Sequence, residues 1–222
     1  MYGFTVIYGK NNIEAMLPSY QRSLKVALPE NNFFFFGYNF FDKFKNDKIF
    51  TEDSQYVIGI DGVILNLQNL KNSYGISNYF SLIKTLFQKN NIHFASQLKG
   101  EFNGFIFDKK KSTLFFFNNK TATKQVFYTS CNKFHIISCS IANIISFKEK
   151  LKITSSLNEN AVYSMLTFGA MLEKQTLVND VFKLLAGKYL VVKEAKIAEK
   201  EYFSFNNTAY TISSKNEAMS RC

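Results

Sequence analysis

The sequence lacks the features that mark disulfide-bonded, linker-containing and membrane-spanning proteins. Its 222 residues include no tryptophan, only two prolines and only three cysteines, which are Cys131, Cys139 and Cys222. So few prolines exclude a proline-rich linker, and an odd cysteine count without paired spacing argues against a disulfide scaffold and a zinc site. No apolar run approaches the roughly 18 residues that span a membrane. The start of the chain also lacks a basic flank followed by an apolar block, so we expect a cytoplasmic protein.

Histidine is equally scarce. His93 and His135 are far apart and lie among apolar residues, so we expect core or surface histidines rather than a metal-binding pair. The sequence predicts no metal site and no cofactor.

Negative charge is in short supply. Lys and Arg total 27 against 17 Asp and Glu, which gives a formal net charge of +10. Nucleic acid or another polyanion would suit this excess. The alternative is lysine scattered through a composition rich in Lys, Asn and Phe, because arginine, which favours specific base recognition, occurs only at Arg22 and Arg221. A polyanion-binding module is one hypothesis, and nucleic acid is not the expected partner.

Apolar and aromatic residues are abundant. Hydrophobic residues make up 46% of the chain, and 25 residues are Phe, which argues against disorder and for a substantial core. Short apolar or alternating runs predict strands at residues 4–8, 24–28, 33–36, 56–65, 102–107, 114–117, 125–128, 134–138 and 189–192. Helical spacing predicts helices at 77–89 with Ser77 as the cap, near 141–147, and from Asn158 to a closing Gly169. In the last helix Val162, Met165, Leu166 and Phe168 are expected to share a face. Many strands and two groups of helices favour an α+β fold with mostly antiparallel sheets.

Residues 98–128 carry a hairpin pattern together with a set of spaced residues: Leu98, Gly100, Phe102, Asp108, Lys124, Phe127 and Tyr128. Their order resembles, without a gap, a segment of class II glutamine amidotransferase domains. That segment reads Leu-Asp-Gly-x-Phe-Ala, an Asp-led turn, and then Arg-Asp-Arg-x-Gly-x-Lys-Pro-Leu-Tyr-Tyr. Met1–Phe4 is similar to the family's Met-Cys-Gly-Ile, and Ile60–Asn66 is similar to its Phe-Asn-Gly-Glu-Ile-Tyr-Asn. Residues 157–187 resemble the end of the domain in asparagine synthetases, where a helix precedes a Leu-x-Pro-Gly turn and a strand.

The resemblance covers residues 1–203 and implies an N-terminal-nucleophile (Ntn) hydrolase fold. This fold is a four-layer αββα sandwich of two mostly antiparallel sheets. The family hydrolyses glutamine and passes the ammonia to an ATP-dependent domain. Residues 204–222 are expected to be a frayed tail or the start of a missing synthetase domain. For Asp61-Gly62 two interpretations stay open, because Asp-Gly between apolar runs signals a hairpin turn whereas the family places this pair at a bend beside the active site.

The family's catalytic chemistry is expected to be absent. Its nucleophile is an N-terminal cysteine, and Tyr2 stands at that position, with no cysteine near it in the sequence. A phenol with a pKa of about 10 is a poor nucleophile at neutral pH, and its bulk should hinder removal of Met1. The oxyanion-hole Asn falls on Asp61, whose ionised carboxylate would repel a developing oxyanion, although Gly62 keeps the backbone donor.

Two substrate-binding positions have changed as well. The acid that holds the glutamine ammonium group falls on Lys99, and the Arg that holds its carboxylate falls near Asn39 or Phe40. The pocket of Tyr2, Asn39, Asp61, Gly62 and Lys99 is therefore expected to be degenerate. An ion pair between Asp61 and Lys99 is a further hypothesis.

The favoured function is a non-catalytic glutaminase-like domain of an asparagine-synthetase-like protein. It would support an ATP-dependent, amide-forming synthetase domain or subunit, and a homodimer is a further expected partner arrangement. The first alternative is an active glutamine amidotransferase whose start codon is mis-assigned. The second is the polyanion-binding module.

Overall fold

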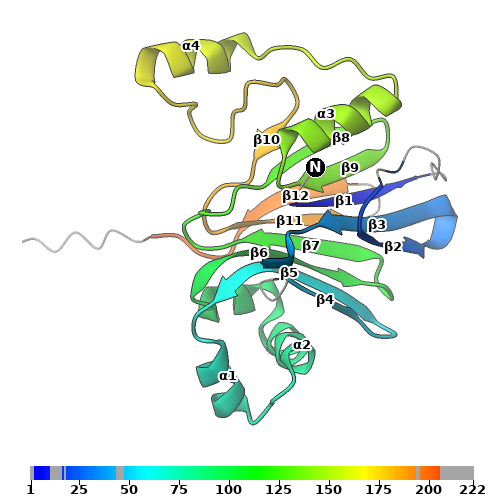
Figure 1. Ribbon diagram of the computed structural model, residues 1–222, viewed down its shortest axis with the longest axis vertical. Coiled ribbons are helices and arrows are strands. Elements are labelled where there is room, and N and C mark those ends of the chain that lie inside the picture. Colours follow the sequence, from blue (N-terminus) through cyan, green and yellow to red (C-terminus); the bar gives the residue numbers. More distant parts are fainter. Residues whose placement is uncertain (1–2, 11–16, 18, 44–47, 194–195, 206–222) are drawn as a thin grey trace, which may run out of the picture.

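The structure is a computed structural model that describes residues 3–10, 17, 19–43, 48–193 and 196–205. Two six-stranded sheets stack face to face, and helices lie on their outer faces (Figure 1). Tyr2, at the family's nucleophile position, lies outside the described residues, as do residues 206–222 of the predicted 204–222 tail.

The first sheet has the strand order β10-β8-β9-β1-β3-β2. Its strands are β1 (Gly3–Lys10), β2 (Arg22–Ala27), β3 (Asn32–Asn39), β8 (Phe127–Cys131), β9 (Phe134–Ser138) and β10 (Phe182–Lys183). Every neighbouring pair is antiparallel.

The second sheet has the strand order β12-β11-β7-β6-β5-β4, also fully antiparallel. Its strands are β4 (Lys48–Glu52), β5 (Tyr56–Ile64), β6 (Gly100–Asp108), β7 (Thr113–Asn118), β11 (Lys188–Lys193) and β12 (Lys196–Glu201). The predicted strands correspond to nine of these twelve elements, and β4, β10 and β12 were not predicted.

The apolar runs form strands that are buried on both faces. In β1, Phe4 and Val6 point into the layer between the sheets, whereas Ile7 points to the outer face. In β6, Phe105 lies between the sheets and Ile106 packs on the helical side. A strand covered on both faces has no polar side to show, which explains runs without alternation.

Three helices cover the sheets and complete the predicted αββα sandwich. The helices α1 (Leu67–Tyr74) and α2 (Tyr79–Asn90) lie against the second sheet, and α3 (Ile141–Lys150) lies against the first. In α2 the buried residues repeat at helical spacing: Leu82, Ile83, Leu86 and Phe87. The predicted helix at 77–89 is confirmed, but its cap is Asn78 rather than Ser77, because the Asn78 side chain accepts a hydrogen bond from the Ser81 N–H.

The fourth helix, α4 (Glu159–Phe168), stands away from the sheets on an arm formed by residues 151–181 (Figure 1). Asn158 caps it by accepting a hydrogen bond from the Ala161 N–H, and Gly169 closes it in the left-handed conformation, as predicted. Most of its apolar side chains are exposed, however: Val162 is half-buried, and Ala161 is the only residue of this helix that is buried. The apolar side chains that were predicted to share a face are therefore not buried against another part of the described chain.

The Asp61-Gly62 pair does not form a hairpin turn. Strand β5 runs without interruption from Tyr56 to Ile64 and pairs with β6 along its whole length. Gly62 adopts a φ of 130° inside this ladder. The glycine therefore serves a close approach of two strands rather than a chain reversal, and the hairpin interpretation is wrong.

Candidate functional site

Two stretches that the family resemblance assigns to the active site lie together between the sheets. Phe4 lies in β1 and Asp61 points from β5 into the same layer. Both line one narrow space, together with Phe50, Asn103, Phe105 and Phe116. The Phe4 ring stacks on Phe116 with centroids 5.5 Å apart. Within the described residues this space is too tight to admit a water molecule. Tyr2, which precedes these residues, lies outside the described residues.

Asp61 is held by an ion pair with Lys124. The Lys124 Nζ atom lies 2.9 Å from Asp61 Oδ1, and the Asp61 side chain is only 10% exposed. A carboxylate taken out of water needs such a partner, because an isolated buried charge is strongly unfavourable. The pair joins two motif positions that lie 63 residues apart in the chain.

The loop before Lys124 is folded around one buried amide. Asn119 is 2% exposed, and its Nδ2 donates to the Gly100 carbonyl and to the Thr123 hydroxyl. Its Oδ1 accepts the Thr123 N–H at 3.1 Å. These bonds fix the loop against the start of β6 and place Lys124 within reach of Asp61.

Gly62 occupies a position that only glycine fits. A Cβ added to it would lie 2.1 Å from the Glu101 carbonyl oxygen. Gly100 on the opposite strand is in the same situation, since an added Cβ would lie 2.1 Å from the Val63 carbonyl oxygen. The two glycines let the backbones of β5 and β6 approach closely beside Asp61.

Lys99 does not reach the Asp61 carboxylate. Its carbonyl accepts the N–H of Leu65, the residue after β5, which is four positions beyond Asp61, or about 13 Å at the rise of an antiparallel strand. Its N–H donates to Asn66 Oδ1 at 2.9 Å, and its side chain is exposed. The hypothesis of an Asp61–Lys99 ion pair is therefore wrong, and Asp61 is paired with Lys124 instead.

Asn39 lies at the end of β3, directly opposite Gly3. Its Oδ1 accepts the Gln21 N–H at 2.7 Å, and Gln21 in turn accepts the Phe40 N–H at 2.8 Å. The fold thus brings Asn39 close to the chain start, as the resemblance implies, but uses its amide oxygen to join β2 to β3.

Sequence reasoning missed one thiol at this place. Cys139 is distant from the chain start in sequence, yet its Sγ lies 3.2 Å from the Phe4 backbone N, from which it accepts a hydrogen bond. The pairing of β1 with β9, in which Thr5 lies opposite Ser138, brings it there. That pairing joins strands more than 130 residues apart, and no local pattern predicts it.

A buried polar cluster supports β1 from its outer face. The Tyr20 hydroxyl donates a hydrogen bond to the Thr5 hydroxyl at 2.6 Å, and the Asn143 Nδ2 of α3 donates one to the Ser138 hydroxyl at 3.2 Å. Burial raises the pKa of the Tyr20 hydroxyl, which keeps it protonated as a donor. The cluster anchors α3 and the segment before β2 to the strand that leads into the site.

Two absences concern the described residues only. No group of three or more His, Cys, Asp or Glu residues there is arranged to hold a metal ion. None of the helices in the same residues has the length and apolar character needed to cross a membrane.

Two stacked antiparallel sheets with helices outside, in which the first strand faces an Asp-Gly strand across the interface, give this molecule the αββα sandwich fold seen in Ntn hydrolases. A family model described as "Glutamine amidotransferase domain" matches residues 44–203, so the chain belongs to the glutamine amidotransferase domain family.

Two solved structures are similar to this chain. One is a glutamine phosphoribosylpyrophosphate amidotransferase from B. subtilis complexed with ADP and GMP, with a TM-score of 0.57, 10% identity, and coverage of 92% of this chain and 50% of that chain. The other is described as the allosteric regulatory enzyme of purine biosynthesis, with a TM-score of 0.50, 9% identity, and coverage of 92% and 44%. Such low identities show a shared fold alone, and this chain spans half or less of the length of either structure. No curated protein matches the chain.

Proposed function

We propose that this chain is a non-catalytic glutaminase-like domain of an asparagine-synthetase-like protein. Its role is to support an ATP-dependent, amide-forming synthetase domain or subunit. The observation that carries the proposal is the ion pair between Asp61 and Lys124 at the position where the family resemblance puts the oxyanion-hole amide.

The ion pair is unsuited to glutamine hydrolysis. An oxyanion hole needs a hydrogen-bond donor aimed at the developing negative charge, and an ionised carboxylate only accepts hydrogen bonds. The ammonium group of Lys124 lies 2.9 Å from the Asp61 carboxylate and neutralises it, so the positive charge of Lys124 serves Asp61 rather than an oxyanion. Four phenylalanine rings line the narrow space beside Asp61, and between the described residues this space has no room for a water molecule.

The residue at the nucleophile position supports the same conclusion. Tyr2 would have to attack the glutamine amide as a phenolate, and a phenol with a pKa of about 10 is almost fully protonated at neutral pH. Replacement of the nucleophile and replacement of the amide donor each remove a separate part of the mechanism.

The asparagine-synthetase branch is supported by the order of elements after β9. Helix α4 is followed by Leu184 and by a turn in which Gly187 has a φ of 64°, and strand β11 starts directly after it. An added Cβ at Gly187 would lie 2.0 Å from the Phe203 carbonyl oxygen, so this turn requires glycine. This succession agrees with the helix, glycine turn and strand of the resemblance.

An ammonia-release assay with glutamine tests the proposal. We expect the wild-type chain to release no more ammonia than a Tyr2→Ala control. Turnover clearly above the control would contradict a non-catalytic role. Intact-mass analysis of the native protein distinguishes the alternative of a mis-assigned start, because an active enzyme would expose an upstream cysteine as its first residue.

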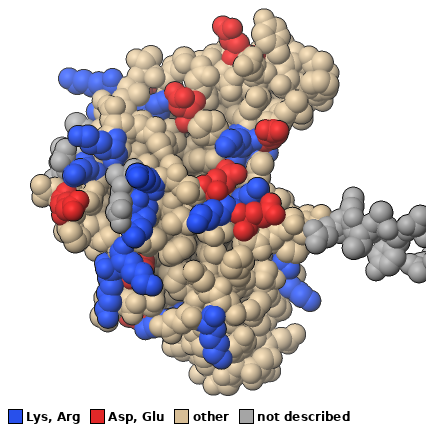
Figure 2. Space-filling model, turned by 180° about the vertical axis from the view of Figure 1, so that it is seen from behind, with Lys and Arg blue, Asp and Glu red and all other residues tan. Residues whose placement is uncertain are grey.

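A second candidate function, polyanion binding, is favoured by the placement of lysines. The β6–β7 and β8–β9 turns lie at one end of the sandwich, as do the paired ends of β11 and β12. At that end we find Lys10, Lys109, Lys110, Lys111, Lys133, Lys193 and Lys196. Figure 2 shows basic side chains gathered on the left of the view, over this end of the sheets. Retention on heparin that falls steeply with salt would support this function, and elution at low salt would argue against it.

A further inference from the structure

The arm exposes large apolar side chains that a soluble surface rarely shows together. In α4 the exposed fractions are 68% for Tyr163, 78% for Leu166 and 65% for Phe168. A helix that is apolar on most of its sides is normally buried, and a contiguous exposed apolar patch normally marks an interaction site. We call these three side chains the α4 knob.

A groove lies at the root of the same arm. Its apolar lining comes from α3 and from the two chain segments that form the root: Ile145, Ile153, Leu157 and Leu177. Its volume is about 610 Å³, and Glu149 and Lys152 contribute charged groups to its lining. Leu157 is 60% exposed, so the groove presents apolar surface outward. The knob and the groove are therefore complementary in chemistry and occur on one chain.

Charge indicates what covers this surface. Residues 160–172 contain no Asp, Glu, Lys or Arg, in a chain whose net charge is +10. Figure 2 shows the corresponding region at the upper right with few charged side chains, whereas the opposite side is crowded with basic ones. Two copies of a strongly basic chain repel each other through most faces, and the arm is a face through which they can meet without juxtaposing lysines.

We propose that the arm is a dimerisation surface, on which the α4 knob of one copy inserts into the groove of a second copy and the reverse contact forms at the same time. Such a two-fold arrangement buries knob and groove twice. It also explains why α4 has a well-formed cap at each end although only Ala161 is buried within its own chain. The proposal concerns association alone and does not depend on the absence of glutaminase activity.

Sedimentation velocity of the full chain over a concentration series tests it, with two variants and a control. Leu166→Asp places a charge on the knob, and Leu157→Lys places the opposite charge in the groove; both side chains are largely exposed, so the fold is kept. Leu65→Asp is the matched control, because Leu65 is also 78% exposed but lies after β5, away from the arm. We expect a dimer for the wild type and the control, and a monomer for each arm variant.

Mixing the two arm variants identifies the geometry. A heterodimer of Leu166→Asp with Leu157→Lys has one unaltered apolar contact and one contact between opposite charges, so the equimolar mixture should dimerise although neither variant does alone. A monomeric wild type, as expected if only a different protein binds the arm, would overturn the proposal. So would loss of the dimer in the control, or a mixture that stays monomeric.

Discussion

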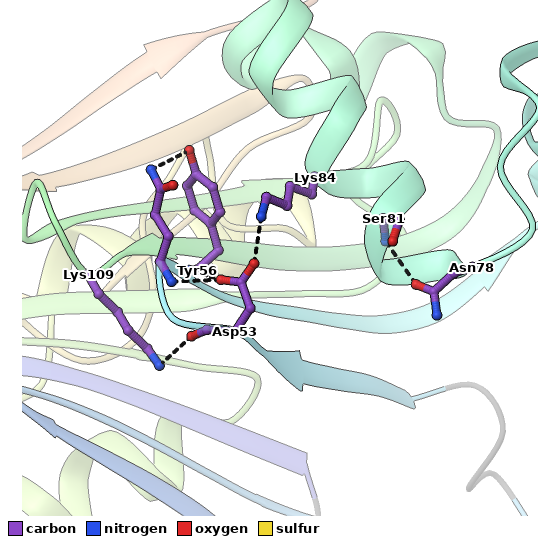
Figure 3. Close-up of polar contacts among 7 residues, drawn as sticks. Asp53, Tyr56, Asn78, Ser81, Lys84 and Lys109 are labelled. Carbon is purple, nitrogen blue, oxygen red and sulfur yellow. Dashed lines mark hydrogen bonds and ion pairs between the residues drawn. The ribbon is translucent and has the colours of Figure 1, made fainter.

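At the residue scale, Asp53 shows how one carboxylate connects three elements. In the turn between β4 and β5 its Oδ1 accepts the N–H groups of Gln55 and Tyr56, both at 2.7 Å, and its Oδ2 lies 2.6 Å from Lys84 Nζ of α2 (Figure 3). Its carbonyl accepts a hydrogen bond from Lys109 after β6. Burial alone would raise the pKa of Asp53, but Lys84 and the two backbone donors outweigh burial and lower the pKa to about 2.

Replacing this carboxylate should make stability less dependent on pH. Because the folded-state pKa of about 2 is below the ordinary 3.8, the stabilisation by Asp53 is complete above pH 3.8 and is lost as the pH falls through 2. We expect Asp53→Asn to lower the free energy of unfolding by about 1 kcal/mol at pH 7, with allowance for partial solvent screening, and by much less near pH 2. Urea unfolding at a series of pH values measures this. The exposed Asp42→Asn is the control, and a pH-independent difference for Asp53→Asn would contradict the assignment.

The residues of the site could be predicted one by one from the sequence, but their contacts could not. Motif spacing identified Asp61, Gly62 and Lys124 individually, because each stands at a recognisable offset. It did not reveal that Asp61 pairs with Lys124 rather than Lys99, since this depends on the register of β5 with β6 and on the loop held by Asn119. Register is a long-range property that individual motifs do not carry.

At the scale of elements, the glycines of β5 and β6 show how a local signal misled. Asp-Gly between apolar runs is typical of hairpin turns. Gly62 is required instead because the Glu101 carbonyl occupies the place of a Cβ. The short helix α1 escaped prediction although Leu67, Leu70 and Tyr74 have helical spacing, and β12 escaped because an edge strand of mostly charged residues has no apolar run.

Substitution of Gly62 should therefore cost much more than substitution of a glycine in open space. We expect Gly62→Ala to lower the free energy of unfolding by about 3 kcal/mol, from backbone strain and from displacement of β6. The matched control is Gly75→Ala, which also has a positive φ of 64° but meets no atom within 4 Å, and should cost about 1 kcal/mol. Guanidinium unfolding compares them, and equal losses would show that the strand contact is unimportant.

At the scale of the whole molecule, phenylalanine joins the two sheets into one unit. Phe34 of β3 stacks on Phe107 of β6 with centroids 4.2 Å apart and ring planes 3° apart, and Phe36 contacts Phe105 at 4.8 Å. The apolar runs predicted strands in mostly antiparallel sheets, and the family resemblance implied the sandwich that covers them on both faces. The arm was not predicted, since the apolar spacing of α4 predicts a buried face but does not say which molecule buries it.

Truncation of one ring should weaken both sheets together. Phe107 is fully buried between them, so we expect Phe107→Ala to lower the free energy of unfolding by about 3–5 kcal/mol. Hydrogen exchange should lose protection in β3 and β6 alike, because both contribute to the same core. Phe41→Ala, at a site that is 50% exposed, should change stability by less than about 1 kcal/mol. Loss of protection confined to one sheet would indicate two independently stable halves.

The root of the arm has an evolutionary consequence. Leu157 and Val178 form an isolated β-bridge, and the Asn158 N–H donates to the Leu177 carbonyl, so the chain leaves and rejoins the main body through a single narrow neck. We expect a segment attached in this way to tolerate changes of length and sequence with little effect on the two sheets, because few contacts tie it to them.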